Sequence, residues 1–176
     1  MEFPKGKLSR IVSLVKDGQD ILDVGCGDGA LAQRLVTKSK KNRIVGIEVE
    51  KTRAVEAGKF MKEVLVADVE DQNTFELISE TFDVIVFSEV LEHCRAPERI
   101  LERAKKLLKG EGYVIICLPN VAFWKTRLNL LMGNWNYTEE GILDRTHLRF
   151  FTLKRRLSSS QGLDTTWKWC FQHIIA

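Results

Sequence analysis

Five short apolar runs alternate with helical patterns along most of this chain, and this alternation limits the possible folds more than any other feature. The runs are ILDVG, RIVGIEV, EVLVADV, FDVIVFS and GYVIICLP, at residues 21–25, 43–49, 63–69, 82–88 and 112–119. Between them, apolar residues recur at helical spacing over 8–15, 30–38, 52–59, 73–79 and 97–110. Strands alternating with helices are typical of a doubly wound α/β domain. We therefore expect a Rossmann-like, mostly parallel sheet with helices on both faces.

The pattern changes after Pro119. Residues 120–152 are rich in aromatic and basic side chains, and we expect a helix over 121–132 followed by a loop. Because the segment follows a strand and is longer than an ordinary connection, we expect an insert or a mobile lid at the sheet edge. A dimer interface or a membrane-surface helix fits the same pattern, because one side of the expected helix is apolar, with Val121, Trp124, Leu128 and Leu131. The tail holds an expected helix, 153–160, and a β-prone run, DTTWKWCF, at 164–171.

Composition and charge narrow the class of protein. A chain of 176 residues has the size of one domain, so we treat 1–176 as a single unit. The net charge of +3 comes from scattered basic residues, which favours a solvated surface over nucleic-acid binding. Four cysteines without a CxxC pair are interpreted as reduced thiols. The sequence has neither a signal-peptide core nor an apolar run near about 20 residues, which predicts a cytoplasmic protein without a membrane span.

The first expected strand ends in a glycine-rich loop. The loop reads Asp23-Val24-Gly25-Cys26-Gly27-Asp28-Gly29. Alternating glycines let the backbone turn tightly and approach a ligand, and amides at the start of the next helix can receive a carboxylate. In an open α/β sheet, ligands bind beyond the carboxyl ends of the strands. The loop is the first candidate for a binding site, although a plain tight turn has a similar composition.

Acidic residues end the next two strands. Glu48 follows the loop by about 20 residues, where an acid can accept hydrogen bonds from ribose hydroxyls. Asp68 can accept from an adenine amino group, or it can act as a helix cap. A nicotinamide dehydrogenase usually has the loop G-x-G-x-x-G, whereas this loop reads G-x-G-x-G and is preceded by Asp23. An acid at that position would repel a pyrophosphate and suits a cationic amino group.

These motifs, ILDVGCGDG, Glu48, Asp68 and FDVIVFSEVLEH, resemble the class I S-adenosylmethionine-dependent methyltransferases over residues 19–118. The later stretches PNVAFWKTRLNLLMG and LDRTHLRFFT are similar to the MetW-like and type 11 or 12 groups. The resemblance implies S-adenosylmethionine as cofactor and S-adenosylhomocysteine as product. It assigns the methionine portion to Asp23, Gly25, Cys26, Gly27 and Gly29, the ribose to Glu48, the adenine to Asp68 and Val69, and the floor near the sulfonium to Ser88, Glu89 and Leu91. Asp28 and Val49, beside these residues, complete the expected cofactor set.

Methyl transfer from a sulfonium needs a nucleophile aligned about 3 Å from the methyl carbon and a site that excludes water. An alcohol or amine acceptor can also need a base. His93 is the first candidate and His147 the second, although His93 can equally be a helix-start residue bonded to backbone.

Other residues of 120–152 are candidates for acceptor binding. Asp144, Arg145 and Arg149 can bind an anionic or sugar-like acceptor, or they can pin the loop through ion pairs. Asn120, Trp124 and Tyr137 can shape the pocket or simply pack.

The sequence therefore predicts methyl transfer from S-adenosylmethionine to a small-molecule acceptor by direct displacement. The spacing of potential ligands is not typical of a metal site, so we expect no metal requirement. Two alternatives stay open: a non-catalytic S-adenosylmethionine-binding partner of another enzyme, and a nicotinamide-dependent oxidoreductase. A homodimer is also open. The family sheet usually ends in an antiparallel strand pair, and the short chain after Gly162 predicts that this pair is incomplete.

Overall fold

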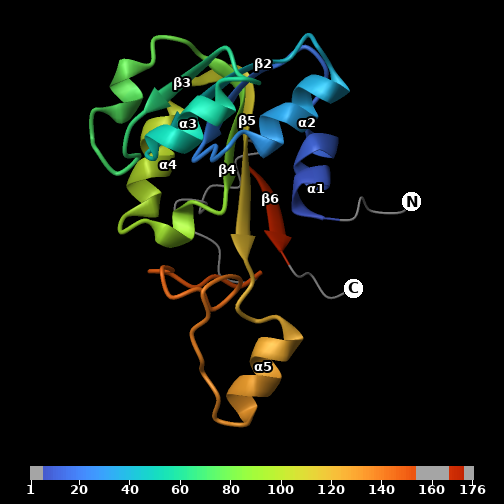
Figure 1. The fold of residues 1–176 in the computed structure, drawn as a ribbon, viewed down its shortest axis with the longest axis vertical. Coiled ribbons are helices and arrows are strands. Elements are labelled where there is room, and N and C mark those ends of the chain that lie inside the picture. Colours follow the sequence, from blue (N-terminus) through green and yellow to red (C-terminus); the bar gives the residue numbers. More distant parts are fainter. Residues whose placement is uncertain (1–5, 154–166, 173–176) are drawn as a thin grey trace.

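The computed structural model describes residues 6–153 and 167–172, which contain a six-stranded sheet (Figure 1). Its strands are β1 (Asp20–Val24), β2 (Arg43–Glu48), β3 (Glu63–Val66), β4 (Phe82–Ser88), β5 (Leu108–Pro119) and β6 (Trp167–Gln172). The strand order is β3-β2-β1-β4-β5-β6, and every neighbouring pair is parallel. Each of the five apolar runs supplies one of the first five strands. The expected doubly wound α/β fold is confirmed.

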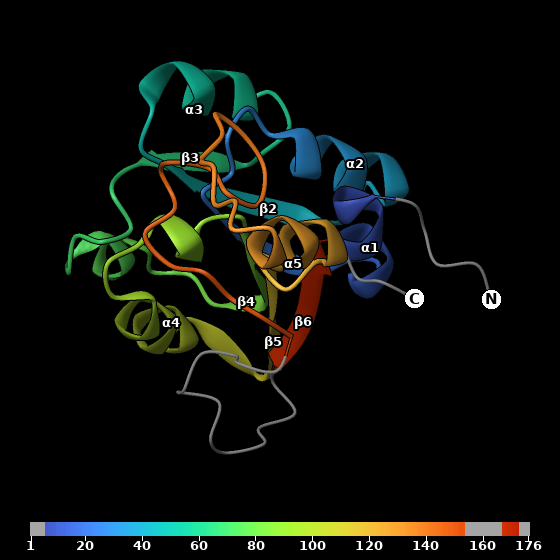
Figure 2. The ribbon, with the colours of Figure 1, turned by 90° about the horizontal axis from the view of Figure 1, so that it is seen from below.

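Helices cover both faces of the sheet (Figure 2). On one face lie α1 (Lys7–Leu14), α2 (Ala30–Lys38) and α3 (Lys51–Ala57), and on the other lies α4 (Pro97–Lys105). Alternate residues of each strand pack in two separate cores, because successive side chains of a strand point to opposite faces of the sheet. Ile21 packs in the cluster that contains Leu35 of α2, and its neighbour Leu22 packs in the cluster that contains Leu101 of α4. The strands are therefore apolar on both sides, as buried parallel strands are.

The strand order reverses at β1, and this reversal determines where a binding crevice can form. Asp23 of β1 pairs with Gly46 of β2 on one side and with Val86 of β4 on the other. The chain leaves β1, β2, β3 and β4 at one edge of the sheet, because all four strands are parallel. A crevice opens beyond the carboxyl ends of strands at such a reversal.

Two expected helices differ from the observed elements. The stripe expected over 97–110 ends as a helix at Lys105, and β5 already begins at Leu108. Leu108 pairs with Phe82 of β4, and the Phe82 amide donates to the Leu107 carbonyl oxygen at 2.8 Å. Pairing with β4 thus outweighs the local helical pattern of Leu107 and Leu108. The weak helix expected over 73–79 is a short 3₁₀ turn, Thr74–Leu77.

The β-prone run near the end of the chain forms β6, which pairs in parallel with β5. The family sheet usually ends at this edge in an antiparallel strand pair, which the short chain after Gly162 predicts to be incomplete. Within the residues that the structure describes, this edge instead carries the single parallel strand β6. The helix expected over 153–160 lies outside the described residues, except for Leu153.

The helix expected over 121–132 is observed as α5 (Trp124–Leu131), which stands apart from the sheet beyond its carboxyl edge (Figure 1). Its apolar side was expected to face the site, but Trp124 and Leu128 are about half exposed and Leu131 is 84% exposed. Only Thr126 of this helix is buried. The expected apolar underside is therefore not packed in this structure.

The chain after α5 returns to the sheet edge. The backbone amides of Leu148 and Arg149 donate to the carbonyl oxygen of Glu92 at 2.8 and 3.1 Å, and the Val121 amide donates to the Phe151 carbonyl oxygen at 2.9 Å. Segment 120–152 thus consists of a projecting helix and a returning stretch that is tied to the end of β4. No described helix has the length and apolar character needed to cross a membrane.

Candidate functional site

The glycine loop after β1 depends on its glycines. Gly25, Gly27 and Gly29 have φ angles of 70°, 58° and 85°, in the left-handed region that L side chains rarely adopt. At Gly29 a Cβ atom would lie 2.8 Å from the Cα atom of Ala57 in α3. The backbone of the loop therefore packs directly on α3, and a side chain at Gly29 would separate the two.

The N–H groups of this loop are used inside the protein. The amides of Gly25 and Cys26 both donate to the carbonyl oxygen of Ile47, at 2.8 and 3.0 Å, and the Asp28 carboxylate accepts from the Ala30 amide at 3.2 Å. We expected amides at this helix start to receive a ligand carboxylate. The Gly25, Cys26 and Ala30 amides already have protein acceptors, so the loop acts mainly by close approach and by fixing the end of β2.

Asp23 is a buried acid beneath the loop. It is 2% exposed, and among the described residues its Oδ2 atom has no hydrogen-bond partner. Burial raises the pKa of Asp23 to about 7, with a further increase from the charge of Glu48 and an opposing effect of Lys7. A buried carboxylate in this situation is stabilised by a cation that binds beside it.

Glu48 and Asp68 end β2 and follow β3 at the same edge. The Glu48 carboxylate accepts from the Gly27 amide at 2.8 Å and from the Glu50 amide at 3.0 Å, which holds it in one orientation. The Asp68 carboxylate accepts from the Glu70 amide at 2.8 Å. This contact is the turn role that we had considered for Asp68, and it leaves the other carboxylate oxygen for a ligand.

Glu48 and Asp68 line a cavity of about 460 Å³, a size typical of small-molecule sites, and Asp23 lies outside this lining. Predicted residues that line it are Gly25, Glu48, Val49, Asp68, Val69, Glu89 and His93. We call it the cofactor cavity. The structure thus brings the ends of β2, β3 and β4 together around the glycine loop, as the motif order predicted.

Other predicted cofactor residues do not line the cofactor cavity. Leu91 is fully buried in the core, and Cys26 packs in the opposite core with its backbone in the loop. Burial raises the pKa of Cys26 to about 12, so its thiol stays protonated. Cys26, Cys94 and Cys117 are buried, as the reduced-thiol interpretation predicts for core thiols. Ser88 is partly buried and ends β4.

Arg53 is a lining residue that sequence reasoning missed. A Cβ atom on Gly27 would lie 2.6 Å from the Nη2 atom of Arg53, so this guanidinium lies across the loop. Its position in the helix after Glu48 was the only available signal, and a surface arginine of a helix has the same pattern.

Glu89 stands at the mouth of the cofactor cavity in a strained conformation. Its φ of 59° is unusual for a residue with a side chain, and its amide donates to the Cys117 carbonyl oxygen at 3.1 Å. The Glu89 carboxylate pairs with the ammonium group of Lys7 in α1. Strain of this kind is often found at ligand sites, where the surrounding fold holds it in place.

A second cavity of about 370 Å³ adjoins the first. It is lined by Glu89, His93, Glu140, Gly141, Asp144 and His147, and we call it the distal cavity. Glu89 and His93 line both cavities. The two histidines that were predicted from sequence as base candidates therefore meet, with ring centroids 4.8 Å apart.

The histidine environment favours neutral His93. Burial lowers the pKa of His93, and the nearby His147 lowers it further. Glu92, which precedes His93, is fully buried, and burial raises the pKa of its carboxyl to about 8. Glu92 was not among the predicted site residues, because an acid in a short turn gives no sign of its burial.

The predicted acceptor residues are spread over segment 120–152. Asp144 lines the distal cavity, whereas Arg145 pairs with Glu139 at 2.6 Å and Arg149 donates to the Arg95 carbonyl oxygen. Asn120 is buried, and its side-chain oxygen accepts from the Ala122 amide.

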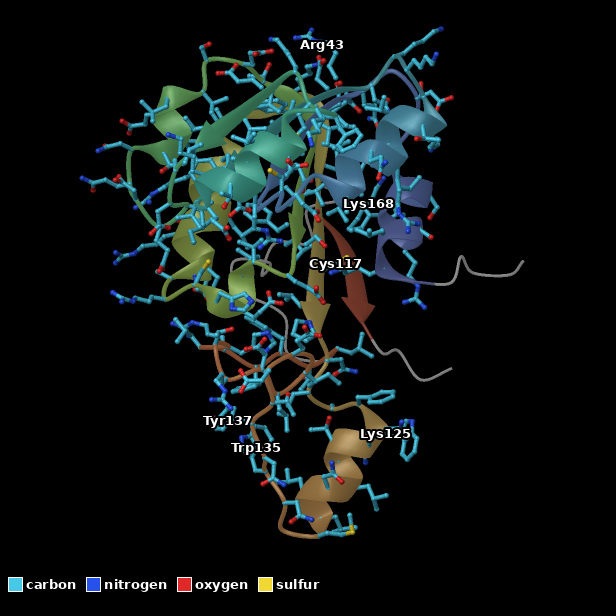
Figure 3. All side chains as sticks on the ribbon, in the orientation of Figure 1. Arg43, Cys117, Lys125, Trp135, Tyr137 and Lys168 are labelled. Carbon is cyan, nitrogen blue, oxygen red and sulfur yellow. The ribbon has the colours of Figure 1, made fainter. Side chains whose placement is uncertain are left out.

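Two aromatic candidates lie farther from the site. Trp124 lines a separate groove of about 750 Å³ along α5. Figure 3 shows Tyr137 below the sheet edge, on the stretch between α5 and the returning chain, and its side chain is exposed. Their role in acceptor binding stays a prediction.

Comparison with known proteins identifies the family of this chain. Residues 5–146 match the family described as methionine biosynthesis protein MetW. The chain belongs to the MetW family. Its match to that family covers the sheet through β5, the cofactor cavity, the distal cavity except His147, and most of segment 120–152.

Curated relatives of this MetW protein include methyltransferases. The mitochondrial ubiquinone biosynthesis O-methyltransferase of Candida albicans is 29% identical over 150 residues, which cover 82% of this chain and 44% of the relative. The (S)-coclaurine N-methyltransferase of Thalictrum flavum subsp. glaucum is 29% identical over 113 residues, covering 58% and 29%. The chain thus spans less than half the length of these two relatives.

Solved structures share the fold. A coclaurine N-methyltransferase bound to N-methylheliamine and S-adenosylhomocysteine has a TM-score of 0.52 at 23% identity, over 65% of this chain and 38% of that one. A mycolic acid cyclopropane synthase complexed with S-adenosylhomocysteine has a TM-score of 0.50 at 26% identity, over 61% and 42%. The Rossmann-like methyltransferase fold is therefore shared.

Proposed function

We propose that this MetW protein binds S-adenosylmethionine in the cofactor cavity and transfers its methyl group to a small acceptor by direct displacement. The observation that carries the proposal is the unpartnered Oδ2 atom of buried Asp23 beside the glycine loop. S-adenosylmethionine has a cationic amino group, which would supply the partner that this carboxylate lacks. A pyrophosphate in the same place would be repelled.

The rest of the cofactor cavity fits the same ligand. Glu48 keeps lone pairs free for ribose hydroxyls while its two amide contacts fix its orientation. Asp68 would accept from the adenine amino group, with Val69 against the ring. Glu89 and the end of β4 would lie near the sulfonium. The order Asp23, Glu48, Asp68 along adjacent strands then follows the ligand from its amino acid end to its base.

The acceptor would enter the distal cavity, whose shared wall with the cofactor cavity places the two ligands side by side. There His93 would take the acceptor proton, because its lowered pKa keeps the imidazole neutral near pH 7. His147 is the second candidate. Asp144, and residues 138–152 in general, would shape the cavity. This is the part of segment 120–152 that we propose as the acceptor-side cover.

The relatives support a transferase. The O-methyltransferase and N-methyltransferase named above act on different acceptors, so they support the shared chemistry and leave the acceptor open. A small-molecule acceptor is the proposed partner, and a homodimer is compatible with the exposed α5. The buried thiols of Cys26 and Cys94 suit a reducing compartment, and we propose a cytoplasmic location on that ground.

Calorimetry tests the proposal. We expect S-adenosylhomocysteine to bind in the micromolar range and NAD to show no binding under the same conditions. Tighter binding of NAD would overturn the proposal in favour of an oxidoreductase. Turnover measured over a panel of hydroxyl and amine acceptors would then separate an enzyme from a non-catalytic binding partner.

A further inference from the structure

Three side chains with metal-binding atoms meet between the two cavities. Glu92 and His93 belong to the short turn after β4, and His147 belongs to the stretch that returns from α5. One potential ligand atom from each residue lies within 4.8 Å of the other two. His147 is far from the other two residues along the chain, so sequence spacing does not predict that it joins them.

The Glu92 carboxylate has no hydrogen-bond partner among the residues that the structure describes. It is 0% exposed, and within the described part of the chain neither carboxylate oxygen has a hydrogen-bond partner. A nearby lysine, Lys7, is paired with Glu89. Buried carboxylates are normally hydrogen-bonded, paired with a cation or bound to a metal. A bound cation would supply the partner that the Glu92 carboxylate lacks among the described residues.

Both imidazoles are oriented as metal ligands usually are. The Nδ1 atom of His93 lies 3.3 Å from the Thr146 carbonyl oxygen, and the Nδ1 atom of His147 lies 3.2 Å from the Ile142 carbonyl oxygen. A carbonyl oxygen can only accept, so Nδ1 carries the hydrogen and Nε2 keeps its lone pair. Histidines that bind metals commonly donate their second nitrogen to a backbone carbonyl in this way.

A further shell of contacts supports this orientation. The Thr146 hydroxyl lies 3.1 Å from the His93 Nδ1 atom and donates to the Asp144 carboxylate at 2.6 Å. The same carboxylate accepts from the Thr146 amide at 2.7 Å. Asp144 therefore holds Thr146, and Thr146 holds His93. Ordered outer contacts of this kind distinguish a built site from three residues that meet by chance.

We propose that Glu92, His93 and His147 bind one divalent transition-metal ion through one carboxylate and two imidazoles. Two imidazoles favour Zn²⁺ or Fe²⁺ over Mg²⁺, which prefers oxygen ligands. Ligand distances of about 2.0 to 2.2 Å put the ligand atoms of a tetrahedral site roughly 3.4 Å apart, so atoms that lie within 4.8 Å would approach one another by up to about 1.5 Å when the ion binds. From the spacing of potential ligands in the sequence we expected no metal requirement, and the proposed site departs from that expectation.

The position of the ion gives it a role in the reaction, a role that rests on the proposed function. His93 lines both cavities and His147 lines the distal cavity, so a vacant coordination position would face the bound acceptor. With the ion bound, His93 is a ligand and does not act as the base. A coordinated hydroxyl would lose its proton to water more readily, because the metal charge stabilises the oxyanion. The acceptor class favoured by this site is a small molecule with a hydroxyl or other oxygen nucleophile.

Metal binding is tested with the full chain stripped of metals by a chelator and measured without S-adenosylmethionine. Co²⁺ titration followed by visible absorbance, and Zn²⁺ titration calorimetry, should give one ion per chain. Glu92→Gln and His147→Ala should each weaken binding by at least about 10-fold. The matched control is Glu140→Gln, which removes another acid of the distal cavity and should leave the affinity within about twofold.

Folding is checked by S-adenosylhomocysteine binding in metal-free buffer, because neither Glu92 nor His147 lines the cofactor cavity. If His147→Ala fails to fold, His147→Gln replaces it. Absence of stoichiometric Co²⁺ and Zn²⁺ binding, or equal affinity in the wild type and the His147 variant, would overturn the metal site. Loss of S-adenosylhomocysteine binding in the wild type would instead overturn the proposed function, so the two failures are distinguishable.

Discussion

The cofactor cavity and segment 120–152 are built in opposite ways. The cofactor cavity is formed by strand ends and by a glycine loop packed directly on α3, and its acids are held by backbone amides. In segment 120–152, α5 projects from the sheet with Leu131 and other apolar side chains exposed. A ligand held by strand ends has its position set by the sheet, whereas a ligand held by the segment depends on a short returning stretch. Changes of the same chemical kind should therefore differ in cost between the two regions.

The largest difference is expected for glycine substitutions. Gly29→Ala should destabilise the fold by about 3 kcal/mol and abolish S-adenosylhomocysteine binding, because a Cβ atom would press on the Ala57 backbone as well as strain the positive φ. Gly133→Ala, after α5, has an equally positive φ but open space around it, and should cost about 1 kcal/mol. Urea unfolding and calorimetry measure both. Equal costs would show that the loop does not need its close approach to α3.

The next effect is expected at Asp23. Asp23→Asn should weaken S-adenosylhomocysteine binding by about 2 kcal/mol, roughly 30-fold, because the ligand amino group loses a charged acceptor. Binding to the wild type should tighten from about pH 6 to about pH 8 as Asp23 ionises, since its pKa is raised to about 7. The variant should lack this pH dependence. A wild-type affinity that does not change over this range would contradict the assignment.

The same raised pKa has a consequence for folding. Asp23 holds its proton in the folded state at pH values where the unfolded chain, with an ordinary pKa of 3.8, has lost it. Its contribution to stability is full below that value and is lost as pH rises to about 7. Asp23→Asn should therefore be more stable than the wild type at neutral pH, relative to the difference at acidic pH. Urea unfolding at two pH values measures this.

An effect of similar size is expected at Glu48. Glu48→Ala should weaken S-adenosylhomocysteine binding by about 1 to 3 kcal/mol, the usual cost of losing a charged hydrogen-bond acceptor. Glu139→Ala removes an exposed acid of segment 120–152 and should leave that affinity unchanged. Calorimetry on the two folded variants sharpens the comparison. An unaltered affinity in Glu48→Ala would show that this acid does not hold the ribose.

The smallest effect is expected on α5. Leu131→Ser should change the free energy of unfolding by no more than about 0.5 kcal/mol, because Leu131 is 84% exposed. Leu101→Ala, in the core beneath α4, should cost about 2 to 5 kcal/mol. A large loss in Leu131→Ser that grows with protein concentration would instead show that α5 packs against a second copy.

The same contrast explains what could be predicted from sequence. The strand runs and the acids that follow them were predicted because each is a local pattern whose meaning is set by parallel strand order. Leu107 and Leu108 were assigned to a helix because their spacing continues the α4 stripe, and only pairing with β4 reveals the strand. The apolar side of α5 was predicted, but its exposure was not, because periodicity gives a face without telling what covers it.

The arrangement of the residues around the distal cavity was even harder to predict from the sequence. His93 and His147 were chosen separately as base candidates, and their meeting depends on backbone bonds from Leu148 and Arg149 to Glu92. The buried state of Glu92 depends on the same returning stretch. No sequence spacing records such long-range contacts, so the cofactor side was largely predictable and the acceptor side was not.

Glu89 and His93 line both cavities, so a ligand in one cavity would be coupled through these side chains to a ligand in the other. A ligand that shifts or neutralises these side chains from one side changes the free energy of binding on the other. Thermodynamic linkage requires the effect to be reciprocal: if an acceptor tightens S-adenosylmethionine binding by some factor, S-adenosylmethionine tightens acceptor binding by the same factor. The coupling free energy can therefore be measured by titrating S-adenosylmethionine with and without a saturating concentration of a candidate acceptor.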